Sequence, residues 1–131
     1  MKITAIEPFL LHVPVTGGSI ADSTHLVTHW GMPGCRIFTD ADFVGYGYTG
    51  THASLALDKL LTSCMTDVYG PLLLGEDPRE VQALHRKLSS DPPTHWAGRG
   101  GITQMALSAV DLALWDIKAK AAAEPLWHLL G

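Results

Sequence analysis

The chain has 131 residues, the size of one ordinary domain, and 47% of them are hydrophobic, which is enough for a sizeable core. Nine Lys and Arg against thirteen Asp and Glu give a formal net charge of −4, so the chain lacks the basic stripe that binds nucleic acid or an anionic membrane surface. We therefore expect neither nucleic acid nor a membrane as a partner.

The two cysteines and the N-terminus indicate a cellular compartment. Cys35 lies in a strand-like run and Cys64 on an apolar helical face, which favours buried free thiols over a disulfide framework. The first residues carry no signal-peptide pattern, and no run reaches the roughly 18 uninterrupted apolar residues of a membrane span. We expect a cytoplasmic protein.

Three segments of the first half have strand composition. Residues 3–15 predict a first strand, in which Pro8 and Pro14 favour an edge position. Residues 35–39 and 43–49 are separated by a short turn and predict a hairpin. In the second of these strands, Gly45 and Gly47 remove side chains from one face, so another backbone or a ligand can approach closely.

A long loop is predicted between the first strand and the hairpin. Residues 16–33 have glycines or prolines at both ends and contain Trp30 with two histidines, His25 and His29. Loops of this length in compact domains are usually functional or disordered. The composition is not that of a simple linker.

Helical periodicity begins after residue 53. An amphipathic helix is expected to begin at Thr51 or Ser54 and to end at Gly70, with an apolar stripe made by Leu57, Leu60, Leu61, Cys64, Met65 and Val68. A second helix is expected to begin at Asp77 in a capping box with Glu80. Its buried stripe is Val81, Leu84 and Leu88, and its end lies at residues 91–93. Residues 94–101 are predicted to form a loop.

The segment from residue 101 to residue 123 predicts a long helix that is apolar around most of its circumference, and such helices are normally buried on several sides. Asp116 lies within the apolar arc, so its carboxylate is expected to find hydrogen-bond donors. Its angular separation from Asp111, about 140°, argues against an acid/base pair. A last short turn is predicted over residues 126–130.

No nucleophile, metal or phosphate motif is evident. His25 and His29 have an i, i+4 spacing that could bind a metal on a helix, but their surroundings are loop-like, and a polar loop that is exposed or contacts a ligand is favoured. The glycines of residues 45–50 lack the lysine and the strand–loop–helix context of a phosphate loop. The remaining histidines on strand or helix faces are expected to be hydrogen-bonded or solvated: His12, His85 and His128.

One sequence pattern resembles a known family. It is the Ser-Ala-x-Asp-x-Ala-Leu-Trp-Asp core within residues 106–120, followed by Pro-Leu and Leu-Leu-Gly in residues 125–131. With residues 1–4 and the Val-Gly-Tyr-Gly of residues 44–47, it resembles the N-terminal capping domain of the enolase superfamily, in its mandelate racemase and muconate lactonizing branch. The resemblance covers essentially the whole chain.

The resemblance implies an α+β fold, in which a three-stranded antiparallel sheet is followed by a helical bundle, as one capping domain over residues 1–131. It also implies a C-terminal (β/α) barrel, absent from this chain, that carries the Mg²⁺ ligands and the Lys or His bases. The parent protein is then expected to be an isomerase or lyase and a homo-oligomer. It would abstract the α-proton of a carboxylate substrate, such as an acid sugar, as a racemase, dehydratase or cycloisomerase. The 131 residues alone would not be catalytic.

In such enzymes two loops of the cap close over the barrel mouth, and here they would be residues 16–33 and 48–53. The substrate-binding residues implied by this placement are Ile20, His25, His29, Trp30, Tyr48, Thr51 and His52. Tyr48 stands where similar domains commonly have an acidic residue, and Asp42 where they have a turn glycine. The alternative is a free-standing, non-catalytic module that uses its apolar helix to bind a partner.

Overall fold

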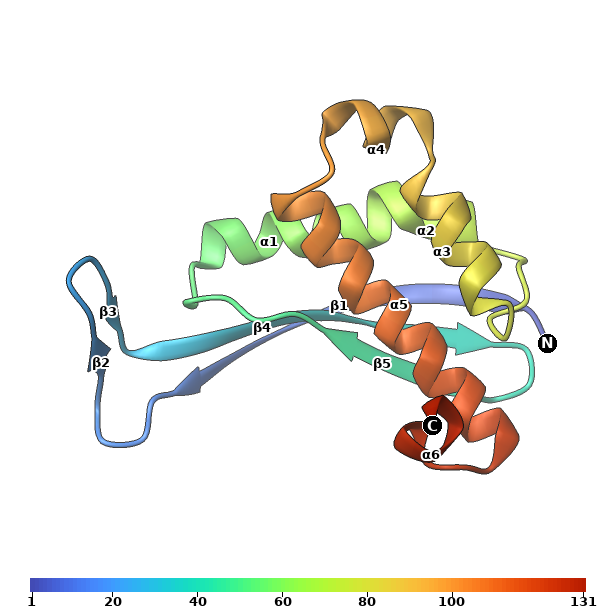
Figure 1. The fold of residues 1–131 in the computed structure, drawn as a ribbon, viewed down its shortest axis with the longest axis horizontal. Helices are drawn as coiled ribbons and strands as arrows, with labels where there is room; N and C mark the ends of the chain where they lie inside the picture. Colours follow the sequence, from blue (N-terminus) through green and yellow to red (C-terminus); the bar gives the residue numbers. More distant parts are fainter.

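A three-stranded antiparallel sheet forms the base of the fold, as predicted (Figure 1). The computed structural model describes residues 1–131. The strands are β1 (Ile3–Pro14), β4 (His29–Thr39) and β5 (Val44–Tyr48), in the order β1-β4-β5. The first strand is therefore at an edge, where its two prolines do not interrupt a ladder on both sides.

The connection between β1 and β4 is more regular than the long loop that we predicted. β4 begins at His29 rather than at residue 35, and two short strands, β2 (Ile20–Ala21) and β3 (Leu26–Val27), form a hairpin beyond the end of the main sheet (Figure 1). Gly31 and Pro33 do not end the strand, because β1 pairs with both: His12 lies opposite Gly31 and Leu10 opposite Pro33. Strand pairing outweighs the local turn preference of these residues.

The first helical segment continues past the predicted end at Gly70. It consists of α1 (Leu55–Ser63), the π-helix η1 (Cys64–Tyr69) and α2 (Gly70–Leu73). Ser54 is the N-cap, one of the two predicted starts, and Gly70 keeps a helical backbone conformation. The wider π-helical turn is accompanied by a buried face at Leu61, Met65, Tyr69 and Leu73. Three members of the predicted apolar stripe are exposed instead: Leu57, Leu60 and Val68.

Two boundaries in the next segment also differ from the prediction. α3 (Val81–Ser89) begins after Glu80, not at Asp77, whose carboxylate instead accepts hydrogen bonds from the backbone and side chain of Arg79. The stripe of Val81, Leu84 and Leu88 is buried as predicted. α4 (Pro92–Ala97) extends into the predicted loop of residues 94–101; Asp91 caps it, and the two prolines in its first turn lack N–H groups that the helix does not need there.

The long apolar helix is α5 (Gly101–Ala122), followed by α6 (Leu126–Leu130), both as predicted. α5 crosses β5 in close contact, since a Cβ atom at Gly45 would overlap the Ala113 carbonyl oxygen and one at Gly47 the Ala109 carbonyl oxygen. Asp116 accepts hydrogen bonds from the Tyr46 amide (2.9 Å) and from Lys120 Nζ (2.6 Å). The prediction that Asp116 finds donors is confirmed.

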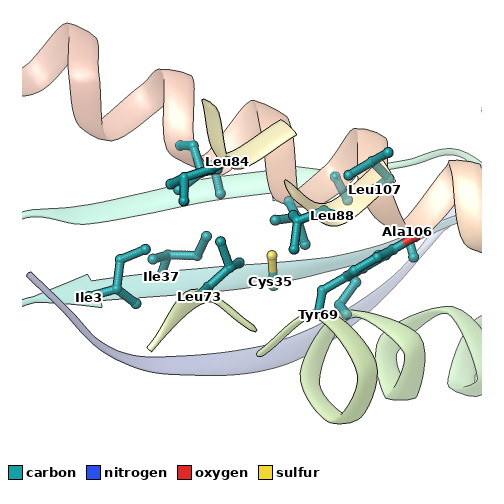
Figure 2. Close-up of a cluster of buried hydrophobic side chains, with 14 of the residues drawn as sticks. Ile3, Cys35, Ile37, Tyr69, Leu73, Leu84, Leu88, Ala106 and Leu107 are labelled. Atoms are coloured by element: carbon teal, nitrogen blue, oxygen red, sulfur yellow. The ribbon is translucent and has the colours of Figure 1, made fainter. Parts of the chain in front are cut away.

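The core lies between the sheet and the helices (Figure 2). Cys35 and Cys64 are both buried free thiols, as predicted, and burial raises the pKa of Cys35 to about 12. The Tyr69 hydroxyl reaches across the core and donates to the Thr103 carbonyl (3.0 Å). None of the helices has the length and apolar character needed to cross a membrane.

Candidate functional site

A cavity of about 350 Å³ lies at the end of the sheet that α5 does not cover. It is formed by the beginning of β4, the end of β5 and the loop that follows β5. Seven residues line it: Trp30, Gly31, Met32, Tyr48, Gly50, Thr51 and His52. Parts of both segments, residues 16–33 and 48–53, therefore line one cavity.

His52 joins the two predicted loops. Its ring centroid lies 5.3 Å from that of His25 and 5.6 Å from that of Trp30, both in edge-on geometry. His25 comes from the turn between β2 and β3, so the small hairpin reaches the cavity through this ring contact. Aromatic pairs at these separations are favourable.

Asp22 holds the turn that carries His25. Its carboxylate accepts hydrogen bonds from the backbone N–H groups of Thr24 (2.8 Å) and His25 (2.7 Å). The Thr24 N–H is the largest cause, followed by the His25 side chain and backbone, of the lowering of the Asp22 pKa to about 2. This is an Asx-type turn, in which a side chain substitutes for the backbone acceptor.

A hydrogen-bond network lies beneath the cavity. The carboxylate of Asp58, on α1, is fully buried. It accepts a hydrogen bond from the Thr51 hydroxyl (2.6 Å), and its other oxygen lies 2.8 Å from His12 Nε2 on β1. Thr51 and Gly31 also exchange two backbone N–H···O bonds of 2.9 Å. The loop that follows β5 is thus bonded to β4 and to α1.

The predicted site residues separate into three groups. Trp30, Tyr48, Thr51 and His52 line the cavity, and His25 contacts His52. Ile20 pairs with Val27 in the small hairpin and His29 begins β4; neither lines the cavity. Substrate binding by any of the seven stays a prediction.

Sequence reasoning missed five contributors. Gly31, Met32 and Gly50 were placed in loops without a role of their own, yet all three line the cavity. His12 was expected to be hydrogen-bonded or solvated and Asp58 was not singled out, although together they support Thr51. Asp58 precedes Leu61 by three residues and Met65 by seven, so the signal available in the sequence was a carboxylate within a buried helical stripe.

The residues of this chain do not fit a metal site. No three His, Cys, Asp or Glu side chains are grouped so that they could hold an ion. His12 with Asp58 and His25 with Asp22 each bring two such side chains together. Mg²⁺ in proteins needs near-octahedral oxygen coordination, commonly from carboxylates and water.

Comparisons with known proteins agree on one family. Residues 9–131 match the N-terminal domain of mandelate racemase / muconate lactonizing enzyme. The chain is 49% identical over 71 residues to a D-galactonate dehydratase family member from Streptomyces sp. (strain SPB074), which covers 54% of this chain and 15% of that protein. It is 39% identical over 92 residues to a 3,6-anhydro-alpha-L-galactonate cycloisomerase from Streptomyces coelicolor, covering 67% of this chain and 23% of that protein.

A solved structure shares the fold over almost the whole chain. L-Talarate dehydratase from Polaromonas sp. JS666, complexed with Mg and L-glucarate, superposes with a TM-score of 0.84 and 29% identity, covering 99% of this chain and 35% of that chain. The chain therefore spans about a third of this solved structure and less than a quarter of the two curated relatives. The three-stranded sheet with its helices is the enolase-type N-terminal domain fold.

Proposed function

Because the chain belongs to the mandelate racemase / muconate lactonizing enzyme family, as its N-terminal domain, we propose that it caps the active site of a Mg²⁺-dependent enolase-superfamily enzyme. The enzyme would abstract the α-proton of a carboxylate substrate, as a racemase, dehydratase or cycloisomerase. The cap would select the substrate and would not supply the bases.

One observation carries this proposal. The β2–β3 turn and the loop after β5 meet at His52, on the side of a cavity whose lining includes Trp30 and Tyr48. Segments that close over a substrate position it and exclude water from the reaction. The residues best placed for this are those nearest the cavity rather than Ile20 and His29, which lie outside its lining.

The chemistry of the cavity suits an acid sugar. Imidazoles at His25 and His52 can donate or accept hydrogen bonds with hydroxyl groups, and the Trp30 ring offers an apolar face beside them. Relatives are named for galactonate and anhydrogalactonate, and a solved neighbour holds L-glucarate. These names favour a sugar acid as the substrate class here.

The rest of the proposed enzyme would be a C-terminal (β/α) barrel, about 220 to 250 residues long. That barrel would hold Mg²⁺ and the proton-abstracting Lys or His, since the residues of this chain do not form a metal site. α5 and α6 would then form the joint between the domains, and the protein would act as a cytoplasmic homo-oligomer.

Variants of the complete gene product test the assignment of the cavity. With acid-sugar substrates, His52→Ala is expected to raise KM about tenfold, because it removes a hydrogen-bonding ring from the centre of the site, and His25→Ala to raise it less. His85→Ala is the matched control, since this histidine lies on α3 and pairs with Asp111. Unchanged kinetics in both His52→Ala and His25→Ala would remove the assignment.

A free-standing interaction module is the second candidate. Its support is the exposure of two large side chains, Trp96 (93%) and Trp127 (76%), since tryptophan is enriched at the centres of protein interfaces. The two candidates differ in gene length and behaviour. A reading frame that continues for a barrel's length would exclude the module, whereas a frame ending at residue 131 with a well-folded monomeric product would exclude the capping domain.

A further inference from the structure

Three segments of the chain converge on the buried carboxylate of Asp58. The register of β1 and β4 places His12 opposite Gly31, and Gly31 is bridged on its other side to Thr51. His12, Gly31 and Thr51 therefore form a row across the end of the sheet. Asp58 bonds to both outer members of the row, Thr51 through Oδ1 and His12 through Oδ2.

This placement is unusual for a carboxylate. Asp58 has no exposed surface, and its neighbours on the same helical face are the buried Leu61 and Met65. An unpaired carboxylate would be strongly unfavourable there, but both of its oxygens have partners. Burying a carboxylate in an apolar stripe is unfavourable, so its presence there indicates a role that an apolar residue could not fill.

Gly31 is part of the same arrangement. A Cβ atom at this position would overlap Thr51 Oγ1 and would lie 2.6 Å from Asp58 Oδ2. The absence of a side chain is what allows the Asp58 carboxylate and the Thr51 hydroxyl to meet over the sheet. The glycine is required here for close approach.

The Thr51 hydroxyl connects this network to the conformation of the loop. While it donates to Asp58, it accepts a hydrogen bond from the Ala53 N–H (3.2 Å). Ala53 has a left-handed backbone (φ 54°), which is unfavourable for a residue with a Cβ and persists only when its surroundings hold it. Between these two fixed residues lies His52, at the centre of the cavity's aromatic contacts.

We propose that Asp58 is a positioning residue for substrate recognition, which holds Thr51 and through it sets the place of His52 in the cavity. The inference deepens the proposed function and rests on it for the identity of the ligand. Asp58 does not line the cavity and would not touch the substrate. Its effect passes through the Thr51 hydroxyl, which links Asp58 to the Ala53 N–H, so substitutions at Thr51 test this link.

The test compares Thr51→Val with Thr51→Ser in the complete gene product. Valine keeps the shape of threonine but lacks the hydroxyl, whereas serine keeps it. Hydrogen–deuterium exchange followed by mass spectrometry reports on the Thr51 and Ala53 amides, both hydrogen-bonded in this loop. We expect exchange in residues 48–54 to be about tenfold faster in Thr51→Val, and KM for the acid sugar to rise about tenfold, with serine close to the wild type. Thr51→Ala replaces the valine variant if the latter does not fold.

The outcomes separate this proposal from the proposed function. If no acid sugar is a substrate, the proposed function fails and the exchange comparison still decides whether the Thr51 hydroxyl, which donates to Asp58, holds the loop. Unchanged exchange in Thr51→Val, or equal acceleration in valine and serine variants, would overturn the positioning role. Faster loop exchange with an unchanged KM in an active enzyme would also overturn it, since the network would then be structural only.

Discussion

The two ends of the sheet are held to the helices in different ways. Under α5, the backbone of β5 meets the backbone of the helix at Gly45 and Gly47, with the Ile117 side chain beside Gly45. At the other end, the strands reach α1 through the side chains of His12, Thr51 and Asp58. The α5 end is thus held mainly by close packing of backbone on backbone, and the cavity end by side-chain hydrogen bonds that single substitutions can remove.

The largest effect is expected from a substitution that breaks the backbone contact between β5 and α5. Gly47→Ala would drive a methyl group into the Ala109 carbonyl and the Ala113 amide, so we expect the free energy of unfolding to fall by about 3 kcal/mol. Gly50→Ala is the matched control, because a Cβ there meets no heavy atom within 4 Å and should change stability by less than about 0.5 kcal/mol. Chemical denaturation measures both. Equal losses in the two variants would refute the close-contact explanation.

A smaller effect is expected at a polar contact between α5 and β5. Asp116→Ala removes the acceptor for the Tyr46 N–H and the partner of Lys120, so the free energy of unfolding should fall by about 1 kcal/mol. Asp116→Asn keeps an oxygen for the Tyr46 N–H and should recover much of the loss. Thermal denaturation distinguishes the variants, and a loss in asparagine as large as in alanine would show that the charge pair with Lys120 dominates.

The smallest effect is expected at the cavity end, in the pH dependence of the turn that Asp22 holds. The Asp22 pKa is lowered to about 2 from 3.8, so the carboxylate stabilises the folded turn above about pH 4. This contribution is lost as the pH falls through about 2, when the carboxylate becomes protonated. Amide exchange of Thr24 and His25 should therefore accelerate, relative to intrinsic rates, between about pH 4 and 2. Asp22→Asn should show no such step, and a step of equal size in that variant would contradict the assignment to Asp22.

The largest error in the sequence-based prediction falls where a partner distant in sequence decides the structure, and the smaller ones at helix ends. β4 was expected to begin at residue 35 because Gly31 and Pro33 usually interrupt strands, but pairing with β1 extends it to His29. The helix expected to end at Gly70 continues to Leu73, because Gly70 keeps a helical backbone conformation and the following proline stands in the first turn of α2. Asp77 closes a separate turn over residues 77–80, where it accepts from the Arg79 N–H, and α3 begins only after that turn.

The site was predictable only in outline. The resemblance placed Trp30 on one loop and Tyr48, Thr51 and His52 on another, and these four residues line one cavity. Met32 lines the cavity, whereas Ile20 and His29 do not, and this difference depends on where β4 starts. The contact of His25 with His52 depends on how the small hairpin folds over the end of the sheet.

By itself, the sequence determined the three strands, the long helix α5, the close approach at Gly45 and Gly47, the buried thiols and the family. Each of these features follows from a residue type or from a periodicity among residues that are close together in the sequence. Only the tertiary structure decided that His12, Gly31, Thr51 and Asp58 meet. His12 and Asp58 are 46 residues apart, and their contact requires a strand register and a helix position that no local pattern specifies.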